Sequence, residues 1–192
     1  MGDEVKRKSK APPEYLTPDE IEGFFRVVAS VRDRALFRLA YHRGLRASEL
    51  GLFQLADYRT NVGRLLVRRL KGSNSGEFLL TQVEQHALRA WIRQRGTAPG
   101  PLFPSRNHRP ISRFRLDQLM KRYCRLAGIP REKAHMHALK HSCGTHLSAR
   151  EPDIVAIQDH LGHANIQNTM KYVQIASKRR DEFSDRLRDW GK

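Results

Sequence analysis

Apolar residues recur at helical spacing along most of this chain, and capping signals divide the pattern into separate helices. In the stretch LTPDEIEGFF, Thr17 can cap a helix, Pro18 suits its first turn, and Glu20 completes a capping box. A second helix is predicted over residues 32–42, and Gly44 is expected to end it in the left-handed conformation. The inner stripe of this second helix is Leu36, Leu39 and Ala40.

The next segment changes from helical to strand-like spacing. The short runs RLLVRRL and EFLL lie on either side of the Gly/Ser/Asn-rich stretch KGSNSG, so the pattern predicts a β-hairpin. Thr81 and Glu84 then form another capping box, which opens a helix that is expected to end near Arg95.

Helical periodicity returns in the second half of the chain. A helix is predicted over residues 112–127, with an inward face of Phe114, Leu119, Tyr123 and Leu126. Further helices are predicted over residues 138–149 and 153–161, around Tyr172, and over residues 178–190, where Phe183, Leu187 and Trp190 form an apolar stripe. The expected fold class is therefore mainly α with a small antiparallel β-sheet (α+β).

Composition adds a strong electrostatic preference. The 192 residues carry 36 Lys and Arg against 20 Asp and Glu, a net charge of +16, which favours a polyanionic partner such as nucleic acid. Cys124 and Cys143 are too few for a disulfide framework, and both are expected to be reduced in a cytoplasmic protein. We find no apolar run near the ~20 residues of a membrane span and no signal-peptide pattern at the N-terminus.

Two early segments carry groups that could act on a phosphate. In RGLRASEL, the guanidinium of Arg46 could fork onto two phosphate oxygens, and Glu49 could hold that side chain or a nearby backbone group. A surface salt bridge is the common alternative at this spacing. Lys71, at the hairpin turn, could deliver a proton to a leaving oxygen, although a solvated turn lysine is the commoner case.

The stretch HMHALKHSCGTH concentrates histidines on one predicted helix. His137, Lys140 and His141 share a helix face, and the spacing of the two histidines also fits a metal site. We expect no metal, because no glutamate lies between the histidines and Lys140 would repel a cation. His141 and His146 are interpreted as structural histidines.

The stretch HLGHANIQNTMKYVQ ends the candidate set. Gly162 can end the preceding helix and direct His163 toward the other candidates, and Tyr172 follows nine residues later. A tyrosine can form a covalent intermediate when neighbouring donors stabilise its phenolate. The alternative is that Tyr172 packs on a neighbouring helix and its hydroxyl reaches water.

Together these segments resemble the catalytic domain of the tyrosine recombinases, the phage-integrase family. GLRASEL resembles the first arginine box, LKGSNSGEFLLT the hairpin lysine box, HALKHSCGTHL the His-x-x-Arg box, and LGHANIQNTMKY the final His-to-Tyr box. The resemblance implies that Tyr172 is the nucleophile, that Arg46 and Lys140 clamp the phosphate, and that Lys71 is the general acid. It also implies that His137 and His163 form hydrogen bonds or transfer protons, and that Glu49 is an acidic support.

This chain departs from the family pattern at two points. Lys140 stands where the family usually has arginine, so a planar fork is replaced by a single ammonium group. Only about fifteen residues precede Leu16, where most relatives carry a DNA-clamping helical domain. The chain could be a piece of a longer protein or a short form similar to the fimbrial phase-variation invertases.

The resemblance also implies an activity and partners. The expected function is site-specific cleavage and rejoining of DNA through a 3′-phosphotyrosine, in integration, excision or inversion, without metal or cofactor. The expected alternatives are type IB topoisomerase-like relaxation, a DNA-binding relative with weakened catalysis, and a metal nuclease. Double-stranded DNA is the expected partner, contacted through the predicted 112–127 helix by Arg113, Arg115, Lys121 and Arg122.

The expected organisation is a disordered basic arm over residues 1–14, a catalytic domain over 15–176 and a C-terminal helix over 177–192. That last helix could pack on its own core or dock on a neighbouring subunit. We expect a monomer or weak dimer free in solution, a homotetramer on DNA, and a cytoplasmic, nucleoid-associated location.

Overall fold

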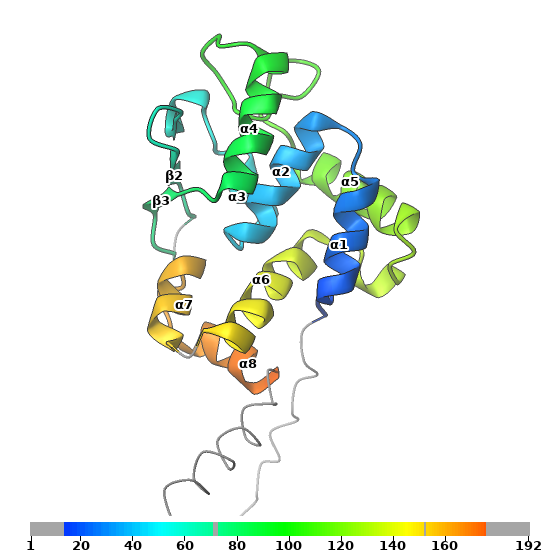
Figure 1. The fold of residues 1–192 in the computed structure, drawn as a ribbon, viewed down its shortest axis with the longest axis vertical. Coiled ribbons are helices and arrows are strands. Elements are labelled where there is room, and N and C mark those ends of the chain that lie inside the picture. The colour runs from blue at the N-terminus through cyan, green and yellow to red at the C-terminus, as the bar shows by residue number, and fades with distance from the viewer. Residues whose placement is uncertain (1–13, 71–72, 152, 176–192) are drawn as a thin grey trace, which may run out of the picture.

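The computed structural model describes residues 14–70, 73–151 and 153–175. Residues 1–13 of the predicted arm, Lys71 and the predicted 178–190 helix lie outside the described residues. The elements follow in the order α1 (Pro18–Val27), α2 (Val31–His42), α3 (Ala47–Leu50), η1 (Leu55–Asp57), β1 (Tyr58–Arg59), β2 (Arg64–Val67), β3 (Gly76–Leu79), α4 (Gln82–Arg95), α5 (Arg113–Leu126), η2 (Arg131–Lys133), α6 (Met136–Arg150), α7 (Ile154–Leu161) and α8 (Gln167–Ile175) (Figure 1).

The helix starts follow the capping signals of the sequence. The Thr17 backbone N–H donates to the Glu20 carboxylate at 2.7 Å, and the Glu20 N–H donates to the Thr17 hydroxyl at 3.2 Å, so the first capping box is confirmed. The box of Thr81 and Glu84 is confirmed in the same way at the start of α4. Glu84 is also fully buried, where its carboxylate accepts hydrogen bonds from the Arg43 guanidinium at the end of α2.

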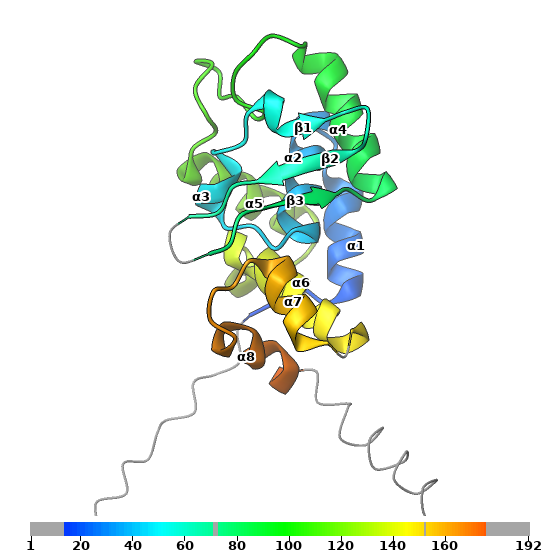
Figure 2. The same ribbon diagram turned by 90° about the vertical axis from the view of Figure 1, so that its left-hand side faces the viewer.

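The predicted hairpin is confirmed and gains a third strand. The sheet is antiparallel with the order β1-β2-β3, and β2 pairs with β3 so that Leu65 faces Phe78 across the ladder. Leu65 and Val67 point inward along β2, and the sheet lies over one side of the helices, in front of α2 (Figure 2). β1 is only two residues long, so it is too short to show the alternation of apolar and polar residues that predicts a strand.

The inward face of α5 differs from the prediction. Leu119 and Tyr123 are buried as expected, but Phe114 is 72% exposed and Leu126 is 55% exposed. At about 100° per residue, Phe114 lies roughly 160° from Leu116 on the opposite side of the helix, and Leu126 is the last residue at the edge of the stripe. The buried stripe consists of Leu116, Leu119, Met120, Tyr123 and Cys124.

α6 belongs to the main core at its start and continues into a smaller group with α7 and α8, in the lower part of Figure 1. α6 packs against α2 on one side and against α7 and α8 on the other. The main apolar cluster extends from Leu16 to Leu139, whereas a small second cluster consists of Cys143, Ile157, Leu161 and Tyr172. Within the described residues, no helix has the length and apolar character that crossing a membrane requires.

Candidate active site

Arg46 lies in the loop between α2 and α3 and caps the short helix. Glu49 Oε2 accepts a hydrogen bond from the Arg46 backbone N–H at 2.7 Å, and Oε1 accepts one from Arg46 Nη1 at 3.0 Å. Both contacts suggested for Glu49 by the sequence are therefore present. Arg46 Nη1 also donates to Ser73 Oγ at 2.7 Å. The Arg46 side chain remains 31% exposed, which leaves part of the guanidinium open to an anion.

The loop before Arg46 depends on a glycine. Gly44 has a φ of +53°, and a Cβ at this position would lie 2.4 Å from Cδ2 of Leu161 on α7. The left-handed turn predicted at Gly44 is confirmed, and the absence of a side chain lets the loop approach the end of α7. The arginine segment and the α7 end are thus held side by side.

Arg69, which was not among the predicted site residues, holds the arginine segment and the end of α7 together through hydrogen bonds. Its side chain is fully buried, and Nη1 donates to the Gly44 carbonyl and to Glu49 Oε2, both at 3.2 Å. Nη2 donates to the carbonyls of Arg43 at 2.8 Å and His160 at 3.1 Å. The Arg69 guanidinium therefore connects the loop before Arg46, the Glu49 carboxylate that holds Arg46, and the end of α7.

Glu49 is the anion at the centre of this cationic cluster. Burial opposes its ionisation, but the hydrogen bond from the Arg46 backbone and the charges of Arg69, Lys140 and Arg46 hold the pKa of Glu49 below its ordinary value. Glu49 is fully buried, so its charge is available to these neighbours and shielded from solvent.

Lys140 lies on α6 with its ammonium group in the same cluster. Nζ donates to the Gly44 carbonyl at 2.9 Å and to the Leu161 carbonyl at 3.4 Å, and the residue is 4% exposed. Burial, followed by repulsion from Arg69 and Arg46, lowers the pKa of Lys140 to about 7. The ammonium therefore loses its proton close to neutral pH.

His163 follows the left-handed Gly162 turn that ends α7. Gly162 has a φ of +65°, and a Cβ there would lie 2.9 Å from Arg69 Nε and from the Asn74 carbonyl oxygen. The Asn74 backbone N–H donates to the Gly162 carbonyl at 3.1 Å, which ties the hairpin to this turn. His163 is buried, its Nδ1 lies 2.9 Å from Thr169 Oγ1, and burial together with nearby lysine charges lowers its pKa to about 3.

Tyr172 on α8 is completely buried, so the alternative in which its hydroxyl reaches water is wrong for this conformation. Its ring lies against Gly144 of α6, where an added Cβ would approach the ring carbons to 2.6 Å. The ring also stacks on His163, with centroids 6.3 Å apart and planes 16° apart. Burial raises the pKa of Tyr172, and the charge of Arg46 partly opposes that rise.

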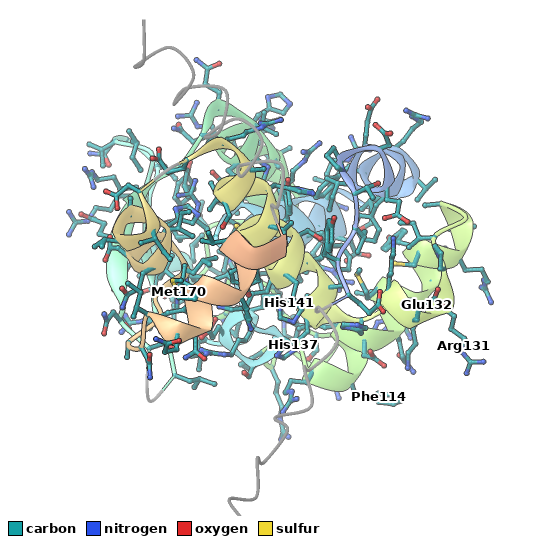
Figure 3. The ribbon with its side chains drawn as sticks, turned by 90° about the horizontal axis from the view of Figure 1, so that it is seen from below. Phe114, Arg131, Glu132, His137, His141 and Met170 are labelled. Atoms are coloured by element: carbon teal, nitrogen blue, oxygen red, sulfur yellow. The ribbon has the colours of Figure 1, made fainter. Side chains whose placement is uncertain are left out.

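The Tyr172 hydroxyl has a histidine partner. His141 Nδ1 on α6 lies 3.0 Å from Tyr172 Oη, whereas His137 is exposed and its ring lies tilted by 58° against that of His141, with centroids 5.9 Å apart. Figure 3 shows His137 and His141 on successive turns of α6 near α8. The interpretation of His141 as a purely structural residue is incomplete, because it contacts the proposed nucleophile. His146 instead pairs with the Tyr41 hydroxyl at 2.9 Å.

The four predicted DNA-contacting residues lie on α5, which packs against α3. Arg113, Arg115, Lys121 and Arg122 are all exposed on α5. Lys121 pairs with Asp117 at 2.7 Å, and Arg115 Nη1 donates to Gln118 Oε1 at 3.2 Å. These are contacts along one helix surface, so the cations remain accessible to a polyanion.

The structure thus brings together most of the predicted site. Arg46, Glu49 and Lys140 share one cluster, Tyr172 and His163 stack beside it, and the nearest described residue after the hairpin turn, Ser73, contacts Arg46. Two signals could have found the missed residues. Position 69 continues the inward alternation of Leu65 and Val67, and a glycine at 144 inside a helix indicates close packing one turn after His141.

Throughout the described ranges, no three His, Cys, Asp or Glu side chains are grouped in a way that could hold a metal ion. His141 directs Nδ1 toward Tyr172, and Lys140 directs its ammonium group to the carbonyls of Gly44 and Leu161.

Comparison with known proteins identifies the family. A model described as the phage integrase family matches residues 14–179. The type 1 fimbriae regulatory protein FimE of Escherichia coli strain K12 is 36% identical over 170 residues, which cover 82% of this chain and 84% of FimE. The chain belongs to the phage integrase family.

Other members support the same assignment. Tyrosine recombinase XerA of Pyrococcus furiosus is 32% identical over 182 residues, and the match covers 92% of this chain and 63% of XerA. A crystal structure of XerA recombinase matches with a TM-score of 0.80 at 23% identity, covering 96% of this chain and 67% of that one. A post-cleavage complex of XerH with its difH substrate matches with a TM-score of 0.77 at 24% identity, covering 90% and 53%. The mainly α fold with a small antiparallel sheet is therefore the phage-integrase catalytic fold.

Membership of the phage integrase family confirms the expected class of enzyme, the tyrosine recombinases. A type IB topoisomerase is not favoured, because the relatives named here are recombinases or a fimbrial regulator. The similarity to FimE over 84% of its length also supports the expected likeness to the short fimbrial proteins.

Proposed function

We propose that this chain is a site-specific recombinase that breaks and rejoins DNA strands through a covalent bond between Tyr172 and a 3′-phosphate. The observation that carries the proposal is the meeting of Tyr172 with His163 and His141 beside the Arg46, Glu49 and Lys140 cluster. These residues come from positions more than a hundred apart in the sequence, yet their side chains surround one small region.

Phosphate binding is assigned to the cationic side of this region. Arg46 is held by Glu49 through its backbone and through Nη1, so its partly exposed guanidinium is pre-oriented for a phosphate oxygen. Lys140 supplies a second positive charge from α6. Removing one such contact in a phosphoryl-transfer site costs about 3 kcal/mol, or about a hundredfold in rate.

The bond changes follow from in-line displacement at phosphorus. The Tyr172 oxygen forms the new bond to phosphorus while the bond to the 5′ oxygen of the DNA breaks. Lys71 is assigned as the general acid that protonates the departing 5′ oxygen. A 5′-hydroxyl from another strand then attacks the phosphotyrosine and restores Tyr172.

Tyr172 has to leave its buried position before it can attack. In the described conformation it has no exposed surface and its hydroxyl is engaged by His141. α8 is short, and it packs mainly against α6 and α7. A shift of this helix upon DNA binding is therefore part of the proposal.

The proposed partner is double-stranded DNA. A net charge of +16 and the exposed cations of α5, Arg113, Arg115, Lys121 and Arg122, support it. The related XerH was crystallised on its difH substrate, which supports the same partner here. We further propose a homotetramer on DNA, a monomer or weak dimer when free, and a cytoplasmic, nucleoid-associated location.

The test is covalent capture of DNA. The purified chain is incubated with nicked duplexes carrying candidate inverted-repeat sites, and a denaturing gel is used to detect a protein–DNA adduct. Tyr172→Phe should abolish the adduct while DNA binding remains. Tyr58→Phe is the matched control, because the buried Tyr58 hydroxyl has no hydrogen-bond partner among the described residues, and it should retain the adduct.

Two outcomes separate the rival functions, and a third tests the nucleophile. Binding without an adduct on any site would indicate a DNA-binding relative with weakened catalysis. Relaxation of supercoiled DNA without a paired site would indicate topoisomerase activity. An adduct that persists in Tyr172→Phe would exclude this tyrosine as the nucleophile.

A further inference from the structure

The first turn of α5 exposes an aromatic side chain between two cations. Phe114 is 72% exposed, the most of any large apolar side chain in the described residues, and its neighbours Arg113 and Arg115 are exposed as well. Figure 3 shows Phe114 at the outer edge of α5, away from the rest of the protein. An exposed aromatic ring favours contact with a partner, and the flanking cations favour an anionic one.

The start of α5 lies beside the segment that carries Arg46. Arg46 caps α3, and a Cβ at Gly51, which ends α3, would lie 3.1 Å from the Ile111 carbonyl oxygen just before α5. Because α3 has four residues, it separates these points by about 6 Å of helix. The major groove of B-DNA is about 12 Å wide. A duplex whose scissile phosphate meets Arg46 therefore has a major groove within reach of Phe114.

A pocket beside the same turn is suited to a backbone phosphate. It has a volume of about 430 Å³ and is lined by Arg32, Ser105, Arg106, Asn107, Ile111 and Arg115. Arg32 is paired with Asp33 at 2.7 Å, so the net positive charge of the pocket comes from Arg106 and Arg115. Guanidinium groups bind phosphate oxygens strongly, and such contacts fix the register of a protein on DNA. A phosphate in this pocket would hold the duplex next to Phe114.

We propose that Phe114 is a specificity-determining residue, which contacts the C5-methyl group of a thymine in the major groove of the target DNA. The proposal rests on the proposed function. A phenyl ring offers neither a donor nor an acceptor to a base edge, and the thymine methyl is the apolar group that the major groove presents. The arginines and the pocket position the backbone, whereas Phe114 selects the base.

The first experiment finds the preferred site by selection from a pool of random duplexes. The unchanged chain and Phe114→Ala are each bound to the pool, and the retained duplexes are sequenced. We expect a position at which the unchanged chain enriches thymine and Phe114→Ala does not, with the preferences at other positions kept. Leu126→Ala is the matched control, because Leu126 is 55% exposed at the other end of the same helix, and it should keep the thymine preference.

The second experiment removes only the methyl group. Deoxyuridine replaces thymidine at that position of the selected duplex, which keeps every hydrogen-bonding group of the base. We expect the affinity of the unchanged chain to fall by about 3- to 10-fold, whereas Phe114→Ala should bind both duplexes equally. 5-Methylcytosine should likewise be bound more tightly than cytosine by the unchanged chain.

Arg106→Ala separates the reading of the base from the contact with the backbone. This variant should weaken binding to the thymine and uracil duplexes by the same factor, because a phosphate contact carries no base preference. It should also reduce the slope of log affinity against log salt by about 1. A larger loss on the thymine duplex than on the uracil duplex would assign the reading of the methyl group to Arg106 and overturn the proposal.

The remaining outcomes distinguish the two levels of the proposal. If nicked forms of the selected duplex give no adduct with the unchanged chain, the proposed function fails. If they give the adduct but no position is enriched in thymine, or if uracil is tolerated, the assignment of Phe114 is overturned while the recombinase function stands. Weaker binding by Phe114→Ala on both duplexes alike would indicate a ring that wedges between bases, and it overturns the assignment too.

Discussion

The buried contact between Arg69 and Glu49 gives the sharpest test of how this site is held together. Both side chains have no exposed surface, and Arg69 Nη1 lies 3.2 Å from Glu49 Oε2. Arg69→Met removes this cation from the buried carboxylate, while the hydrogen bonds from Arg46 to both oxygens of Glu49 and the nearby charge of Lys140 remain. Breaking a buried pair from one side costs about 3–5 kcal/mol.

Other contacts of Arg69 also contribute to the stability that Arg69→Met would lose. The carbonyls of Arg43 and His160 also lose a donor in Arg69→Met, whereas the Gly44 carbonyl keeps Lys140. We therefore expect a loss of about 3–5 kcal/mol, which lowers the melting temperature by about 6–20 °C for a chain of this size. Adduct formation, measured well below that temperature, should fall by about 10- to 100-fold because Glu49 no longer holds Arg46 in one orientation.

Two further variants make this prediction refutable. Adding Glu49→Gln to Arg69→Met removes the stranded charge, so the double variant should regain about 1–3 kcal/mol relative to Arg69→Met alone. Arg26→Met breaks an ion pair with Glu22 whose side chains are 73% and 74% exposed, and it should change stability by less than about 1 kcal/mol. A melting temperature for Arg69→Met within 2 °C of the parent, or a double variant less stable than the single one, would refute the reasoning.

Three other predictions follow from the site and its surface. The pKa of Lys140 is about 7, and the cation is the form that binds phosphate, so the rate of adduct formation at subsaturating DNA should fall as pH rises through about 7. Lys140→Arg stays protonated, so this decline should disappear in the variant and its rate should be preserved or higher. Gly144→Ala should lose about 1–3 kcal/mol in thermal melts, since its Cβ meets the Tyr172 ring, whereas Gly23→Ala, with open space around it in α1, should be neutral or stabilising. Replacing Arg113 and Arg115 with alanine should reduce the slope of log affinity against log salt by about 2, and unchanged slopes would remove α5 from the DNA interface.

Local signals in the sequence were enough to predict most elements of the fold. Thr17 with Glu20 and Thr81 with Glu84 form the predicted capping boxes, and Gly44 and Gly162 adopt the predicted left-handed turns. These features depend on residues a few positions apart, so the sequence carries them directly. The inward position predicted for Phe114 is wrong, because a residue two positions before Leu116 lies on the opposite side of the helix from the buried stripe.

The site could be predicted less completely, because its decisive contacts join distant segments. Arg46 and Glu49 are three residues apart, and their contact was foreseen. Arg69 reaches carbonyls 25, 26 and 91 positions away, and no local pattern specifies such partners. The contact between His141 and Tyr172 likewise spans 31 positions and depends on how α6 and α8 pack.

The arrangement also suggests how lysine is accommodated at position 140. Lys140 and Arg69 share the Gly44 carbonyl, and Arg69 holds the two neighbouring carbonyls of Arg43 and His160. Arg69 therefore holds the backbone around the site by its hydrogen bonds to these carbonyls. A planar guanidinium at position 140 is not needed to hold that backbone. Lys140 and Arg69 both act on Glu49, but an arginine keeps its charge at neutral pH, whereas the pKa of Lys140 is about 7. Lys140 is therefore the one of these two cations that can lose its charge near neutral pH. Lysine at this position consequently preserves the fold while making phosphate binding sensitive to pH.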